Sequence, residues 1–79
     1  MNHRYFVADH QTGDTAHYPS AAQAVAAGRA LARAKINAQG LTGLHEKQHQ
    51  DGCLYLGVAD AANTGFYLGA LVSVGKLNS

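Results

Sequence analysis

The sequence predicts an α+β fold in which one helix packs on an antiparallel sheet, with the elements in the order β-β-α-β-β-β. Three observations support this prediction. An alanine-rich segment with helical spacing begins at a capping residue, Ser20. Segments rich in aromatic and β-branched residues, which favour strands, lie on both sides of it. After the alanine-rich segment the repeat of apolar residues changes from three or four to two, as expected where a helix gives way to strands.

Length and composition indicate a single compact domain, residues 1–79. A domain of this size buries only about 60% of the surface that its unfolded chain exposes, so a partner or a second copy would add stability. The formal net charge is +1, which creates no strong long-range field. The one cysteine, Cys53, permits no intrachain disulfide, and no apolar run is long enough to span a membrane. We therefore expect a cytoplasmic protein.

The N-terminal part of the chain is expected to form a hairpin. Residues 4–8 are aromatic and β-branched enough for a strand, and residues 11–14 supply turn chemistry after it. Residues 15–18 can return as a short partner strand, which Pro19 ends.

The helix is expected over residues 21–38. The run from Ser20 to Gln23 fits a capping box, in which the serine hydroxyl accepts a backbone amide and the glutamine reaches back. Gly40 is a natural stop. Small residues at helical spacing predict a narrow stripe that lets a sheet approach closely. The stripe comprises Ala21, Ala24, Val25, Gly28, Leu31 and Ala32.

Three further strands are expected, over residues 41–50, 53–59 and 65–74. A three-residue loop at 50–52 with Gly52 in the left-handed conformation pairs the first two strands in a defined register. That register places His49 opposite Cys53, Lys47 opposite Tyr55, and Leu44 opposite Val58. A two-residue turn would instead bury two histidines and a lysine under the helix without an evident partner, which is costly.

This register divides the side chains of the last three strands between two faces. The residues expected to face the helix are Leu44, Leu54, Leu56, Val58, Phe66, Leu68, Ala70, Val72 and Val74. Those expected on the opposite face are His45, Lys47, His49, Cys53, Tyr55, Tyr67 and Leu71. One helix covers one face, so the second set predicts a surface that binds a partner or a second copy. Tyr67→Ala would then weaken this binding more than tenfold.

The run from His45 to His49 spells H-E-x-x-H, which on a helix holds zinc with the glutamate as general base. Glycines on both sides favour a strand instead, in which the two histidines are about 13 Å apart and cannot share an ion. His49 beside Cys53 could activate a thiolate, yet no third residue orients the imidazole. We therefore expect no catalytic residues, no metal and no cofactor.

Two sets of cations could serve recognition. Arg29 and Arg33 lie four residues apart on the helix and could grip phosphate or an acidic partner. Lys47, with His45 and His49, lies beside Tyr55 and Tyr67 in a combination that could stack nucleic-acid bases. No ribonucleoprotein signature accompanies it. The tyrosine-bearing face could equally close a homodimer or recognise a foreign protein.

In length and layout, with a leading hairpin, one helix and a short meander, the chain resembles the small anti-CRISPR proteins that phages and mobile elements use against type I CRISPR systems. The resemblance involves no shared motif. It implies non-enzymatic inhibition in a bacterial host cell, by binding a subunit of the surveillance complex and blocking target-DNA capture or nuclease recruitment. Many such inhibitors are acidic DNA mimics; this chain is not, so the expected mechanism is steric occlusion. The alternative function is a small nucleic-acid-binding module.

Overall fold

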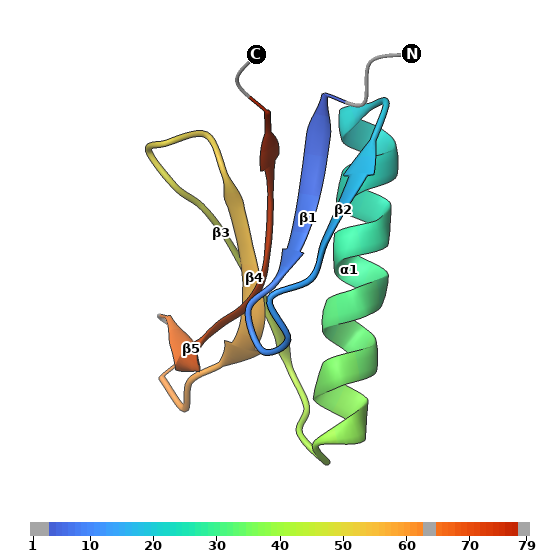
Figure 1. Cartoon of the computed structure of the whole chain (residues 1–79). Helices are drawn as coiled ribbons and strands as arrows, with labels where there is room; N and C mark the ends of the chain where they lie inside the picture. Colours follow the sequence, from blue (N-terminus) through green and yellow to red (C-terminus); the bar gives the residue numbers. More distant parts are fainter. Residues whose placement is uncertain (1–3, 63–64, 78–79) are drawn as a thin grey trace.

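The computed structural model describes residues 4–62 and 65–77, without the side chain of Leu68, and it shows the predicted α+β fold (Figure 1). The elements are β1 (Tyr5–Asp9), β2 (Thr15–Tyr18), α1 (Ala21–Ala38), β3 (Leu44–Gln48), β4 (Leu54–Ala59) and β5 (Phe66–Lys76). The bounds of β2 and α1 match the prediction. The other strands begin or end up to three residues from their predicted bounds.

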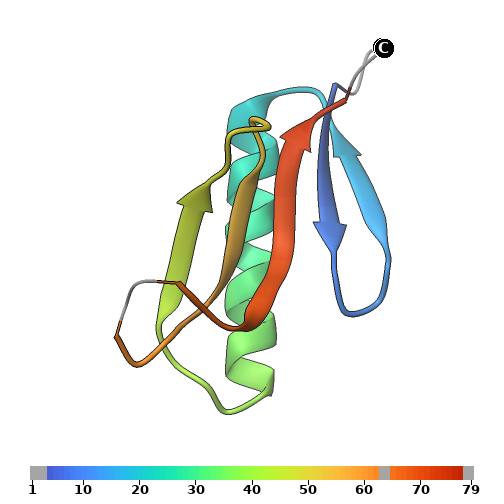
Figure 2. The same ribbon diagram turned by 90° about the vertical axis from the view of Figure 1, so that its left-hand side faces the viewer.

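The strands form one antiparallel sheet of five strands in the order β2-β1-β5-β4-β3. The helix follows one edge strand, β2, and precedes the other, β3, and it packs across a single face of the sheet (Figures 1 and 2). The last strand, β5, lies in the centre and joins the β1–β2 hairpin to the β3–β4 hairpin.

The helix begins and ends as its sequence predicts. The Ser20 hydroxyl accepts a hydrogen bond from the amide of Gln23 at 3.2 Å. The glutamine side chain accepts a hydrogen bond from that hydroxyl at 3.1 Å rather than bonding the backbone of Ser20, so the capping box is only half formed. At the other end Gly40 has φ 70°, and the amide of Leu41 donates to the Ile36 carbonyl, which closes a Schellman motif.

A stripe of four residues on α1, spaced by four, packs on the sheet: Ala24, Gly28, Ala32 and Ile36 are all buried. The predicted stripe was wrong at its start, because Ala21 is exposed, and it omitted Ile36. An ideal Cβ on Gly28 would overlap Cγ2 of Val74 and lie 3.4 Å from Cδ1 of Leu56. The small residues therefore set how closely helix and sheet approach.

The β3–β4 hairpin has the predicted register. Leu44 pairs with Val58 and Lys47 pairs with Tyr55. The loop glycine, Gly52, has φ 90°, and the amide of His49 donates to the Cys53 carbonyl at 2.8 Å. The three-residue loop is thus confirmed.

A bulge in β5 overturns part of the predicted face assignment. Leu56 pairs with Val72, but Val58 pairs with Tyr67, so β5 uses five residues where β4 uses two. The three extra residues are an odd number, and they invert the alternation of side chains in the first part of β5. Phe66, predicted to face the helix, therefore lies on the uncovered side, and Tyr67 on the helix side. The predicted orientation of Leu68 falls outside the described side chains.

Candidate functional site on the open face of the sheet

The side of the sheet that α1 does not cover, here called the open face, is the face turned to the viewer in Figure 2. Its residues follow from the registers of the strands and from their contacts. They are Phe6, His10, Thr15, His17, His45, Lys47, His49, Cys53, Tyr55, Phe66 and Ser73. All four histidines that the structure describes belong to this set.

Tyr55 lies at the centre of a polar and aromatic cluster. Its ring makes edge contacts with the rings of His10 and His49, with centroids 6.2 and 5.5 Å away. Its hydroxyl donates to Asp51 Oδ2 at 3.3 Å, and His10 Nε2 lies 2.9 Å from the Ser73 hydroxyl. The cluster connects four parts of the chain: the loop after β1, strands β4 and β5, and the loop between β3 and β4.

Glycines let aromatic side chains lie flat against this face. An ideal Cβ on Gly75 would lie 2.7 Å from both the Phe6 ring and the Cys53 sulfur, so these two side chains cover the glycine. At the other end Phe66 lies 2.9 Å from an ideal Cβ on Gly57 and makes an edge contact with His45 at 5.0 Å. Rings therefore lie at both ends of the open face as well as around Tyr55.

The H-E-x-x-H run lies on β3 and its hairpin, as the strand prediction requires. Glu46 points to the helix side, where Arg29 binds it through two nitrogens at 2.8 and 2.9 Å, whereas His45 and His49 point to the open face. The hydrogen bond from Arg29 holds the pKa of Glu46 below its usual range, despite partial burial, which raises it. The glutamate therefore cannot act on an ion or a water held by the two histidines.

Cys53 has poor chemistry for a nucleophile. Burial raises the pKa of its thiol, and the negative charge of Asp51 raises it further. The ring of His49 faces Asp51, with Nδ1 3.4 Å from Oδ1. This arrangement favours the protonated thiol over the thiolate.

The helix side carries the other carboxylate contact. Asp9 is 8% exposed, and its Oδ2 lies 2.8 Å from Nζ of Lys35 on α1. Burial alone would raise the pKa of Asp9, but the hydrogen bond from Lys35 and the amides of Gln11 and Thr12 outweigh it and lower the pKa. This ion pair fixes the β1–β2 turn to the end of the helix.

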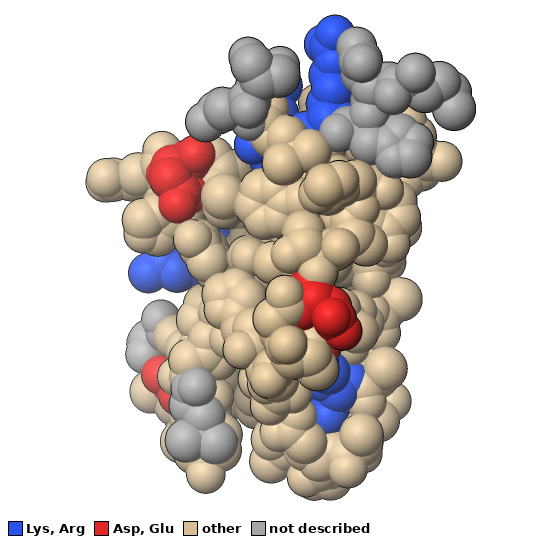
Figure 3. Space-filling view, in the orientation of Figure 1, with Lys and Arg blue, Asp and Glu red and all other residues tan. Residues whose placement is uncertain are grey.

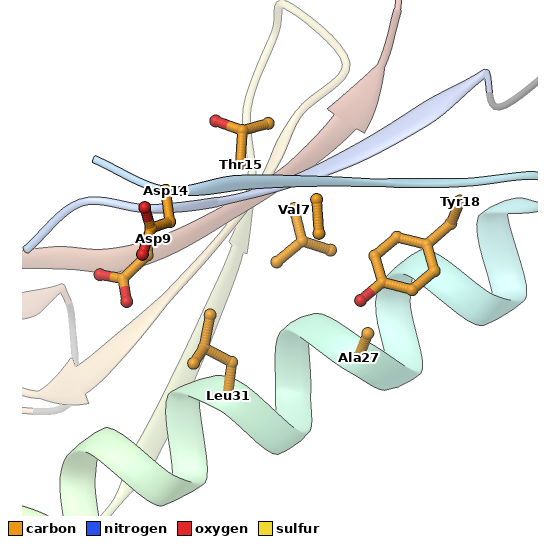
Figure 4. A pocket seen from close by; sticks show the side chains of 8 residues that line it. Val7, Asp9, Asp14, Thr15, Tyr18, Ala27 and Leu31 are labelled. Carbon is orange, nitrogen blue, oxygen red and sulfur yellow. The ribbon is translucent and has the colours of Figure 1, made fainter. Parts of the chain in front are cut away.

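Two hollows flank α1, because one helix is narrower than the sheet. Five strands about 4.8 Å apart span about 19 Å, whereas a helix is about 10 Å wide. Under β2 the hollow has a volume of about 280 Å³, and Figure 4 shows Asp9 and Asp14 near one end of it and Tyr18 near the other. A second hollow, about 250 Å³, lies beside the start of β3 and includes Arg33. Both follow from the packing of the layers.

The structure separates the predicted site residues. Tyr55, Lys47, His45 and His49 share the open face. Arg29 is bound to Glu46, and the charge of the exposed Arg33 also lowers the pKa of Glu46, so both arginines act on a carboxylate of the chain itself.

Two other predicted site residues lie elsewhere. Tyr67, 50% exposed, pairs with Val58 on the opposite side of the sheet from Tyr55. Leu71 is 7% exposed and belongs to the core. Sequence reasoning missed Phe6, His10, His17 and Ser73, although strict alternation along the first two strands would have placed Phe6 and His17 together.

Two further properties concern the described residues, 4–62 and 65–77. No group of three or more histidine, cysteine, aspartate or glutamate side chains lies close enough to hold a metal ion. In the same residues, no helix has the length and apolarity needed to cross a membrane.

In the view of Figure 3, charged side chains are scattered in small groups over a mostly uncharged surface. No family model, curated protein or solved structure matches this chain.

Proposed function

We propose that this chain is a non-enzymatic inhibitor that binds a protein subunit of a type I CRISPR surveillance complex through its open face. By occupying that subunit it sterically blocks target-DNA capture or nuclease recruitment. The observation that carries the proposal is the open face, a sheet surface of aromatic and histidine side chains that no described element covers. Aromatic side chains on an accessible patch are the usual anchors of protein interfaces. The likeness to small anti-CRISPR proteins in length and layout supplies the class of partner.

The chemistry of the open face supports binding rather than turnover. Ser73 is 6% exposed in the central strand, where a substrate cannot reach its hydroxyl. Cys53 favours its protonated form, and the glutamate of the H-E-x-x-H run is bound to Arg29 on the other side of the sheet. Among the residues of this face that the structure describes, these groups are thus not arranged as the nucleophile and base of acyl transfer or hydrolysis need to be.

Steric blocking fits this surface better than DNA mimicry. Imitation of a phosphate backbone needs a regular array of carboxylates, and the described strand residues of the open face carry none. Asp51, at the tip of the β3–β4 hairpin, contacts Tyr55 on this side. The partner surface therefore need not be the basic channel that holds nucleic acid.

The proposal is tested by target-DNA capture in a gel-shift assay with reconstituted type I complexes of several subtypes. The wild-type chain should inhibit capture or nuclease recruitment in at least one of them. Tyr55→Ala should weaken binding more than tenfold, while Tyr67→Ala, a matched control on the opposite side of the sheet, should retain it. Circular dichroism establishes that both variants are folded. Failure to bind any type I complex overturns the proposal, and loss of binding in Tyr67→Ala alone moves the site off the open face.

A second candidate function is nucleic-acid binding, favoured by the pairing of Lys47 directly opposite Tyr55 on the open face. A cation beside an aromatic ring suits the backbone and a stacked base of a single strand. Titration of an oligonucleotide at several salt concentrations tests it, because each neutralised phosphate adds about 0.7 to the slope of log K against log salt. A homodimer closed by the open face would be measured by sedimentation of the same samples.

A further inference from the structure

The sheet separates charge between its two sides. On the helix side Asp9 is bound by Lys35, and Glu46 is bound by Arg29. Asp14 lines the hollow between β2 and α1, on the same side. Three of the five carboxylates of the chain are thus placed on the covered side, two of them neutralised by helix cations.

The open face has the opposite character. His17 on β2 lies at one edge of the sheet, and His45, Lys47 and His49 lie at the other edge, on β3 and its hairpin. Between them the central strands present Phe6 and Tyr55. The described strand residues of this face carry no carboxylate. An aromatic centre between two edges that can carry positive charge has the anatomy of a protein interface with an apolar core and a polar rim.

We propose that the open face binds a carboxylate-rich protein surface, and that it binds more tightly as the pH falls from about 8 to about 6. The proposal rests on the proposed function in one respect, that the partner is a protein. Histidine is the side-chain type whose charge changes in this range. The four histidines that the structure describes lie on this one face. Carboxylates on the partner remain ionised throughout the range.

The surroundings of the histidines leave them available to a partner. His49 faces Asp51 and Tyr55, and His10 faces Ser73 and Tyr55. His45 lies against the ring of Phe66, with Lys47 next along the same face of the strand. His17 lies opposite Phe6. Of these described contacts, one involves a carboxylate, Asp51.

The same observations favour a protein over a nucleic acid as the acidic partner. Phosphate binding at neutral pH depends on permanent cations, and the strand residues of the open face supply one, Lys47. The rings of Tyr55 and Phe66 are in edge contact with histidines, which limits flat stacking of bases.

The test uses the full chain and fluorescein-labelled poly-L-glutamate, followed by fluorescence anisotropy at constant ionic strength. The dissociation constant should fall at least tenfold between about pH 8 and about pH 6. A triple variant, His17→Gln with His45→Gln and His49→Gln, should reduce this change to less than twofold. Arg33→Gln removes a cation from the helix flank and serves as the matched control, which should keep the full change. Circular dichroism at both pH values establishes that each protein is folded.

Three results would overturn the inference. They are affinity for poly-L-glutamate that is absent or independent of pH, a pH dependence that survives in the folded triple variant, and tighter binding of oligo-thymidylate than of poly-L-glutamate at matched charge. The last result would assign the face to nucleic acid. Because the probe contains no CRISPR component, the expected behaviour toward it would stand even if every type I complex proved unaffected. Inhibition of such a complex without any response to poly-L-glutamate would reject this inference alone.

Discussion

Replacing Gly28 by alanine should destabilise the protein, although alanine is the better helix former. Gly28 is in the middle of α1 and faces the sheet, where an ideal Cβ would overlap Cγ2 of Val74 and touch Leu56. Val74 is 4% exposed and lies on the central strand, so it cannot move aside without disturbing its neighbours. Its β-branched side chain also has few rotamers to choose from.

Two opposing terms set the change that Gly28→Ala makes to the free energy of unfolding. A glycine-to-alanine change in a helix interior gains about 1 kcal/mol of intrinsic propensity. Forcing an extra methyl group into a well-packed core costs about 1–3 kcal/mol, and the overlap with Val74 places this site at the upper end. The net loss should be about 1–2 kcal/mol, and each kcal/mol lowers the melting temperature of a domain this size by about 4–8 °C.

Urea unfolding followed by circular dichroism measures both terms. Ala26→Gly, at an exposed position of the same helix, gives the propensity term alone and should lose about 1 kcal/mol. In a Val74→Ala background the added methyl group has room, so Gly28→Ala should there be neutral or stabilising. A gain of stability from Gly28→Ala in the wild-type chain would refute the close approach of helix and sheet.

Three further outcomes are expected. Ser20→Ala removes the hydroxyl that caps α1 and should lower the free energy of unfolding by about 1 kcal/mol in the same urea assay. Because the pKa of Asp9 is lowered in the folded state, this residue stabilises the fold above the ordinary aspartate range and ceases to do so as the pH falls through the lowered pKa. Asp9→Asn should therefore flatten the acid limb of a stability-against-pH curve below about pH 5, and an unchanged limb would show that the pKa of Asp9 is not lowered by folding. Glu46→Gln should leave binding by the open face intact, since its side chain contacts Arg29 on the other side, and metal analysis should find no stoichiometric zinc in the wild type.

Local signals in the sequence were sufficient for the helix and for one hairpin. Ser20 and Gly40 have side-chain and backbone preferences that act within a few residues, and the structure has both ends of α1 at the predicted positions. The cost of burying Lys47 selected the longer loop at Gly52, and the register followed from it. For the helix the deciding interactions are local. For the hairpin, only one register avoids a buried charge.

The bulge in β5 could not be predicted in the same way. Regular alternation along residues 66–76 was the simplest assumption, and Gly69, with φ 83°, is where the strand departs from it. The three inserted residues are defined only by how β5 pairs with β4, and the sequence of β5 alone does not record this pairing. The contact of Arg29 with Glu46 was missed for a related reason, because it depends on how the helix lies across the sheet.

The central position of β5 has a consequence for how the chain folds. Neither hairpin contacts the other in the sheet until the strand that is last in sequence inserts between them. Tyr5, near one end of the chain, pairs with Lys76, near the other, so the decisive pairing is among the most distant in sequence. Such non-local pairing slows folding, because the entropy of closing the loop is lost before the contacts form. During synthesis, the apolar stripe of α1 therefore cannot pack on β5 until almost the whole described chain has been made.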